Sequence, residues 1–180
     1  PVEWSIVRPK DKEIQKQLPR GFGYLYCSQD GLLNKGTVDN GTLRFELGEG
    51  CRMVVLPDTD RASPELLKKF RQLLNAGVSV YATHRPKRAI GMQDSQERNA
   101  QVSRVADELW GDVDGKKVTS RRVGKGLLIQ GVPLGKALDM ADIQPDFTYI
   151  NADGSSVDKS PSSGNLPPIN FLHRHTEETD

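Results

Sequence analysis

The chain has 180 residues, of which 36% are hydrophobic and 27% charged, and its formal net charge is +1 at pH 7. This balance is typical of one globular domain with a real core and leaves little room for a second full domain. The near-neutral charge and the lack of an apolar stretch approaching about 20 residues argue against nucleic acid and against a membrane as partners.

The first residues of the sequence do not have the pattern of a targeting signal. Its first five residues, PVEWS, lack the charged and apolar regions of a signal peptide, and the chain does not begin with Met. We therefore expect an excised piece of a longer protein. Cys27 and Cys51 lack metal-binding spacing, so we expect two small buried residues or, if the parent is exported, a disulfide.

The first third of the chain alternates turn signals with short apolar patterns. A turn-rich break is predicted at residues 19–23, followed by β structure at 24–27 and a short helix at 29–33. A hairpin turn is predicted at 39–41, and the alternation at 42–47 is typical of a half-buried strand. These elements lead into the most strongly patterned stretch of the sequence.

Residues 52–82 predict a βαβ unit. An apolar run at 52–57 and another at 78–82 flank a helix with Ser63 as N-cap, Pro64 at the first position and Gly77 after the last turn. Leucines and Phe70 fall on one face of that helix. We expect parallel strands joined by a right-handed crossover.

The second half continues the pattern with a loop at 83–94, a helix at 95–110, two strands at 118–123 and 127–130, a short helix at 133–141 and a strand at 147–149. The predicted fold class is α/β, with an open, mostly parallel central sheet and helices on both faces. We expect one domain over residues 1–150, a Gly/Ser/Pro-rich loop or linker at 151–168, and a terminal strand at 169–180 that leads into a following domain.

Polar residues follow both central strands, where ligands of parallel sheets bind. They are Asp58, Thr59, Asp60 and Arg61 after the first strand, and Thr83, His84 and Arg85 after the second. Carboxylate, imidazole and guanidinium at one edge suit an acid-base, anion-binding or domain-contact site. The structural alternative is that the aspartates form a turn before the helix while the arginines are solvated or pair with them.

Other chemistry receives little support from the sequence. Thr83 stands where a nucleophile elbow would need Ser or Cys between small residues, and Gly124-Lys-Gly126 has turn spacing rather than that of a phosphate loop. His173 and His175 have no supporting carboxylates at metal-site spacing. We therefore predict no catalytic residue, no metal and no cofactor.

Several short motifs in order carry a resemblance that covers nearly the whole chain. They are PRGFGYLYCS at 19–28, LLN at 32–34, NG at 40–41, MVVLPDTDR at 53–61 with SP at 63–64, ADELWG at 106–111, GKG at 124–126 and FLHR at 171–174. In these motifs the chain resembles a region of large bacterial α-L-rhamnosidase-like glycoside hydrolases of family 106.

The resemblance implies a flavodoxin-like or class I glutamine amidotransferase-like accessory domain beside a catalytic (β/α) barrel that holds the catalytic glutamates and any calcium. The amidotransferase cysteine is absent, and Thr83 and His84 stand near its place. The implied partners are that barrel, neighbouring β-domains of the same chain and plant or pectic oligosaccharides. The implied location of the parent is periplasmic or extracellular.

The leading hypothesis is a non-catalytic accessory domain that packs on, or shapes, the catalytic domain of an exported glycoside hydrolase. Two alternatives stay open. One is a stand-alone small hydrolase that uses Asp58, Asp60, His84 and Arg85, and the other is a carbohydrate-binding module with its site at the same edge.

Overall fold

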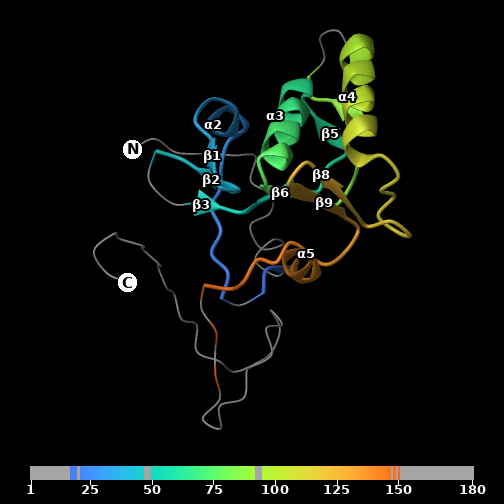
Figure 1. Ribbon diagram of the computed structural model, residues 1–180. Coiled ribbons are helices and arrows are strands. Elements are labelled where there is room, and N and C mark those ends of the chain that lie inside the picture. The colour runs from blue at the N-terminus through green and yellow to red at the C-terminus, as the bar shows by residue number, and fades with distance from the viewer. Residues whose placement is uncertain are drawn as a thin grey trace.

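The computed structural model describes residues 17–19, 21–46, 50–91, 95–146, 148 and 150, and Figure 1 shows the path of the chain. The helices in these ranges are α2 (Gln29–Asn34), α3 (Pro64–Asn75), α4 (Ser95–Trp110) and α5 (Leu134–Met140). The strands are β1 (Thr37–Asp39), β2 (Thr42–Arg44), β3 (Gly50–Cys51), β4 (Met53–Val55), β5 (Arg61–Ala62), β6 (Ser79–Ala82), β7 (Arg88–Ala89), β8 (Ser120–Val123) and β9 (Gly126–Gln130). The fold is mixed α/β.

The largest sheet among the described residues has the strand order β4-β6-β9-β8. Strands β4, β6 and β9 are parallel, with Val54 beside Val80 and Val80 beside Leu128. Strand β8 is antiparallel to β9. The predicted βαβ unit is therefore confirmed, and the two predicted strands around residues 124–126 form an antiparallel hairpin.

Helix α3 forms where its capping residues predict it. The Ser63 side chain accepts a hydrogen bond from the backbone N–H of Leu66 at 3.1 Å, Pro64 opens the helix, and Gly77 has φ +104° just past its end. Its buried residues are Pro64, Leu67, Phe70, Leu73 and Leu74. This apolar face lies on the sheet because it must be removed from water.

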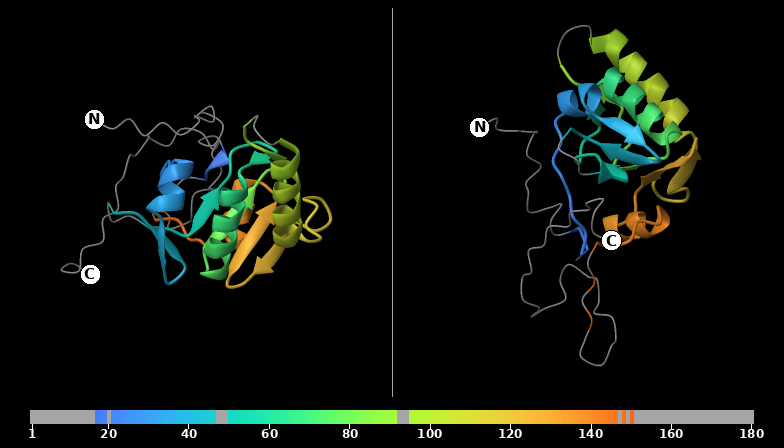
Figure 2. Two further views of the ribbon diagram at one scale, coloured as in Figure 1. Left: turned by 90° about the horizontal axis from the view of Figure 1, so that it is seen from above. Right: turned by 60° about the vertical axis from the view of Figure 1, so that its left-hand side comes forward.

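The sheet separates two layers of apolar side chains. Helices α3 and α4 run side by side over one face, and α5 lies on the other (Figures 1 and 2). Along β6, Val80 and Ala82 pack under α3 and α4, whereas Tyr81 packs on the α5 side. This alternation follows from the period of two in a strand.

The sheet β1-β2-β3 is antiparallel and lies with α2 beside α3 (Figure 1). The Nζ of Lys69 on α3 donates to the carbonyl oxygens of Leu33 at 3.4 Å and Gly36 at 2.9 Å. The predicted hairpin is confirmed, with Asn40 at φ 46° and Gly41 at φ 76° in its turn. Strand β2 ends at Arg44, earlier than the alternation to residue 47 predicts.

Three further expectations can be compared with the structure. Residues 24–27 form no strand although their side chains favour one, because no described strand lies beside them to complete a ladder. Cys27 and Cys51 are half-buried, and no disulfide joins them. None of the described helices is long and apolar enough to cross a membrane. The predictions for residues 151–180 and for Phe147 and Tyr149 lie outside the described residues.

The segment after β6 holds a short strand where the sequence suggests only a loop. Strands β5 and β7 form a two-residue parallel ladder that pairs Arg61 with Arg88 and Ala62 with Ala89. Both alanines are buried. The ladder joins the segment that follows β4 to the segment that follows β6.

Candidate functional site

An open pocket of about 430 Å³ lies at the carboxyl ends of the parallel strands. It is lined by Asp60, His84, Arg85, Lys87, Gly111, Asp112, Val113, Asp114 and Gln130. Three of the seven residues predicted for this edge, Asp60, His84 and Arg85, contribute to the lining. The α4–β8 loop and the end of β9 supply walls that the sequence prediction did not include.

Asp58 and His84 form an exposed ion pair beside the pocket. The Oδ1 of Asp58 lies 3.1 Å from Nε2 of His84, and their side chains are 67% and 60% exposed. An ion pair with this much solvent around it contributes little to stability. Thr83 is hydrogen-bonded to the hydroxyl of Tyr81, which itself donates to the Val132 carbonyl at 2.8 Å.

Asp60 joins the two strands of the small parallel ladder. Its Oδ2 accepts hydrogen bonds from Nε and Nη2 of Arg88 at 3.1 and 2.8 Å. Its carbonyl oxygen accepts from the backbone N–H of Lys87 at 2.7 Å. The hydrogen bonds from Arg88 hold the pKa of Asp60 below its usual value. In the same turn, the hydroxyl of Thr59 accepts from the backbone N–H of Arg61 at 3.1 Å.

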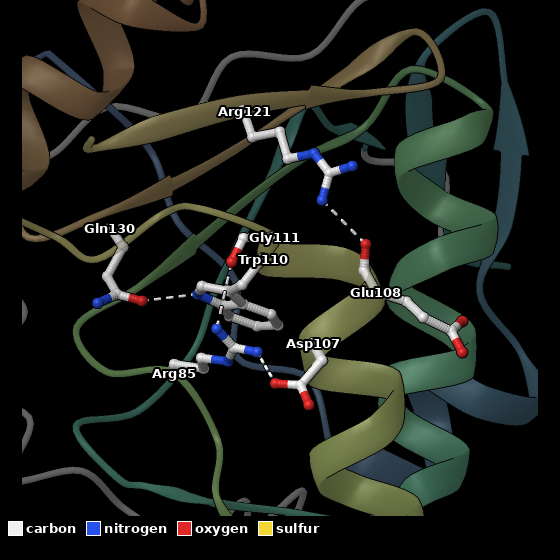
Figure 3. A network of polar contacts seen from close by, with 7 residues as sticks. All are labelled: Arg85, Asp107, Glu108, Trp110, Gly111, Arg121 and Gln130. Atoms are coloured by element: carbon white, nitrogen blue, oxygen red, sulfur yellow. Dashed lines mark hydrogen bonds and ion pairs between the residues drawn. The ribbon is translucent and has the colours of Figure 1, made fainter.

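Arg85 secures the end of α4 (Figure 3). Its Nη2 is paired with the carboxylate of Asp107, and its Nη1 donates to the Gly111 carbonyl at 3.4 Å. On the other side, Nη1 of Arg121 donates to the carbonyl of Glu108 at 3.0 Å. Two guanidinium groups thus satisfy carbonyls at a helix C-terminus, where positive charge is favourable. Partial burial lowers the pKa of Arg85.

Gln130 ends strand β9 at the pocket, and only 8% of it is exposed. Its Oε1 accepts a hydrogen bond of 2.6 Å from Nε1 of the fully buried Trp110 (Figure 3). Gly115, at φ +71°, passes so close that a Cβ there would lie 2.6 Å from Nε2 of Gln130. The position of this amide is therefore fixed by a buried indole on one side and by backbone on another.

Asp114 shapes the loop between α4 and β8. Its Oδ1 accepts from the backbone N–H groups of Lys116 and Lys117, both at 2.8 Å, and of Val118 at 3.0 Å. These bonds lower the pKa of Asp114, because they favour the ionised carboxylate. No group of three His, Cys, Asp or Glu residues with the proximity of a metal site occurs in the described part of the chain.

The structure thus brings the predicted residues to one edge and gives several of them structural partners. The structural alternative expects a turn made by Asp58 and Asp60; the turn that forms is closed by the hydroxyl of Thr59, and Asp60 pairs with Arg88 rather than with Arg61 or Arg85. The sequence reasoning missed Lys87, Asp112, Asp114 and Gln130. Gln130 had a usable signal, because it is the polar residue at the end of a third apolar strand.

Comparisons with known proteins decide the family. The sequence model of glycoside hydrolase family 106, described as alpha-L-rhamnosidase, matches residues 6–180. The chain belongs to this family. The resemblance drawn from the short motifs is confirmed at the level of family 106, whereas the amidotransferase-like accessory subtype stays a prediction.

Two proteins related to this family 106 chain are much longer than the matched region. A Formosa agariphila protein named "Putative beta-glucuronidase" is 26% identical over 143 residues, which are 79% of this chain and 10% of that protein. The structure of a rhamnosidase from Novosphingobium sp. PP1Y matches with a TM-score of 0.59 and 23% identity, over 74% of this chain and 12% of that one. The structural match shows a shared fold. The chain spans about a tenth of the length of each relative.

Proposed function

We propose that the chain is a non-catalytic α/β domain of a larger, exported glycoside hydrolase that acts on α-L-rhamnosides. In this proposal the domain is flavodoxin-like, and it packs against a catalytic barrel and neighbouring β-domains of the same polypeptide or shapes the substrate cleft. Membership of family 106 supports the reaction class and the export of the whole protein.

The state of two of the three pocket carboxylates, Asp60 and Asp114, supports the non-catalytic part of the proposal. Glycoside hydrolysis needs a general acid whose pKa is raised, opposite a second carboxylate. At this pocket, the pKa values of Asp60 and Asp114 are lowered by the hydrogen bonds they accept from Arg88 and from a backbone turn. Both carboxylates are held ionised, which suits structural anchors and not proton donors.

The path of the chain gives a second argument. Strands β4, β6 and β9 succeed one another in the sheet in sequence order, and both connecting helices, α3 and α4, pack on the same face. Catalytic crevices of open α/β sheets form where the strand order reverses and helices leave on opposite faces. These three strands contain no such reversal, so the pocket does not lie at a topological switch point between them.

The length of the relatives is compatible with this assignment. Each is about ten times longer than the region matched by this chain, which leaves room for a separate catalytic domain. The alternative of a stand-alone hydrolase is weaker, because Asp60 and Arg85 are already paired with Arg88 and Asp107.

The test uses the complete polypeptide that contains this chain. Asp60→Asn, His84→Ala and Asp112→Asn are introduced singly, with Lys68→Met on the outer face of α3 as a control, and hydrolysis of an aryl α-L-rhamnoside is measured. We expect kcat to stay within about threefold of the parent for every variant. A loss of about 100-fold or more, the typical cost of removing a general acid or base, would show that this edge is catalytic.

A further inference from the structure

One polar side chain of the pocket, Gln130, has a hydrogen-bonding end that the described residues do not use. Indole nitrogen only donates, so Trp110 requires Oε1 of Gln130 as acceptor and thereby fixes which end of the amide carries the hydrogens. None of the described residues accepts a hydrogen bond from Nε2 of Gln130. Figure 3 shows that this nitrogen points away from Trp110.

This amide nitrogen has a fixed position and is accessible from the pocket. The described residues contain no fully buried side-chain nitrogen or oxygen that lacks a partner, so the free Nε2 reaches the pocket that Gln130 lines. Only 8% of Gln130 is exposed. Its side chain keeps one rotamer because Trp110 and Gly115 pack against it on two sides. The amide nitrogen therefore offers an N–H donor of fixed direction to the pocket.

Groups of both charges surround this donor. Lys87 and Asp112 line the same pocket, and neither side chain has a hydrogen bond or ion pair to any described residue. His84 adds an exposed imidazole that is shared with Asp58. An anionic ligand would meet the carboxylate of Asp112, and a cationic ligand would meet the ammonium of Lys87. The lining instead suits a neutral ligand whose groups both donate and accept.

We propose that this pocket is a non-catalytic binding site for a neutral, hydroxyl-rich sugar unit. A pair of neighbouring hydroxyls satisfies the lining: one accepts from the Gln130 amide and Lys87, and the other donates to Asp112. The choice of a sugar among neutral polyols rests on the proposed function of the parent as a glycoside hydrolase. The site would hold a sugar of the substrate away from the bond that is cleaved.

The experiment titrates the ¹⁵N-labelled 180-residue chain with L-rhamnose up to millimolar concentrations, and then with an oligosaccharide that contains it. The side-chain amide of Gln130 and the indole N–H of Trp110 are the reporters, and the chain has only two tryptophans to assign. We expect both signals to shift in a saturable way. Folded chain whose Gln130 amide does not shift with either sugar would overturn the proposal.

Three variants separate binding from folding. Lys87→Met removes an exposed, unpaired donor and should raise Kd about five- to tenfold, the equivalent of one net hydrogen bond. Gln130→Glu keeps an acceptor for Trp110 but exchanges the N–H donors for an oxygen, so binding should be lost while the indole signal shows a folded chain. Lys68→Met, on the exposed face of α3, should leave Kd unchanged. If Gln130→Glu unfolds, equal Kd values for Lys87→Met and Lys68→Met decide against the site.

The two proposals fail in different ways. A pocket substitution that abolishes hydrolysis in the complete polypeptide, while sugar still shifts Gln130, removes the non-catalytic assignment and leaves the binding site. Unchanged hydrolysis together with no sugar-dependent shift removes the binding site and leaves the assignment of an accessory domain.

Discussion

The two faces of the β4-β6-β9-β8 sheet are covered in different ways. The face under α3 and α4 is closed by side chains with no exposure at all, including those of Leu67, Leu73 and Leu74. The face under α5 is closed by one short helix together with partly buried residues from distant parts of the chain, such as Leu18 and Phe22. The first face is covered by helices that are close together in the sequence, and the second is covered by segments that are far apart in the sequence.

This difference predicts where the free energy of folding is concentrated. Apolar burial stabilises in proportion to the area removed from water, and voids in a dense region are costly because neighbours cannot relax into them. The α3/α4 face should therefore be more sensitive to truncation than the α5 face, whose cover can shift. The following experiments on the full chain test that contrast, from the largest expected effect to the smallest.

Truncation of Phe70 should have the largest effect. Its side chain is 1% exposed at the centre of α3. Phe70→Ala should lower the free energy of unfolding by about 3–5 kcal/mol, through lost burial and the cavity left behind. Urea denaturation followed by circular dichroism measures the change, and Lys68→Ala on the outer face of the same helix should change it by less than about 0.5 kcal/mol.

Truncation on the other face should cost less. Leu138 on α5 is 6% exposed and packs against a cluster with several partly buried members. Leu138→Ala should lower the free energy of unfolding by about 2 kcal/mol, the low end for a leucine. A loss equal to that of Phe70→Ala, in the same urea experiment, would mean that both faces are packed with equal rigidity and would break the contrast.

Removal of the α3 cap tests the denser face at its edge. Ser63→Ala deletes the oxygen that accepts from the N–H of Leu66 and should cost about 1 kcal/mol. Ser63→Gly should cost only a few tenths of a kcal/mol, because glycine leaves the helix terminus open to water. Both variants lack the hydroxyl, so the difference between the two midpoints in urea measures how far water replaces its hydrogen bond; equal losses would mean that water does not reach the N–H of Leu66 in the glycine variant.

Acid should destabilise the protein through carboxylates at the edge of the sheet and not through the apolar residues of either face. The pKa values of Asp60 and Asp114 are lowered from 3.8, so their stabilising contribution is complete above about pH 4 and is lost as pH falls through their lower folded values. Melting temperature should decline gently below pH 3.8. Asp114→Ala should make that decline shallower, whereas Asp139→Ala on α5 should not; a decline of the same slope in both variants would exclude Asp114 as its source.

Much of the denser face is predictable from local sequence. Ser63, Pro64 and Gly77 mark the ends of α3 unambiguously, and the spacing of its leucines gives the buried face. The α5 face is less predictable, because Leu18 packs against a cluster whose members lie between residues 81 and 138, far from it in the sequence. The periodic pattern of one segment gives no information about which distant segment packs against it.

The candidate site was predictable in position more than in composition. Residues after two parallel strands pointed to the edge where the pocket lies, but the partners of Asp60 and Arg85 come from β7 and α4. Gln130 was missed because residues 127–130 were paired only with their hairpin neighbour, and their parallel pairing with β6 is a long-range contact. Residues 24–27 show the opposite error, in which propensity favoured a strand although no strand of the described chain lies beside them.

The β5–β7 ladder has a consequence for the thermodynamics of any ligand that enters the pocket. Because the ladder and the Asp60–Arg88 pair tie the segments after β4 and β6 together, one rim of the pocket is already ordered before binding. A ligand then loses its own freedom but immobilises little of the protein. Binding should therefore show nearly the same backbone amide protection in β5 and β7 with and without ligand, and an association rate that no loop closure limits.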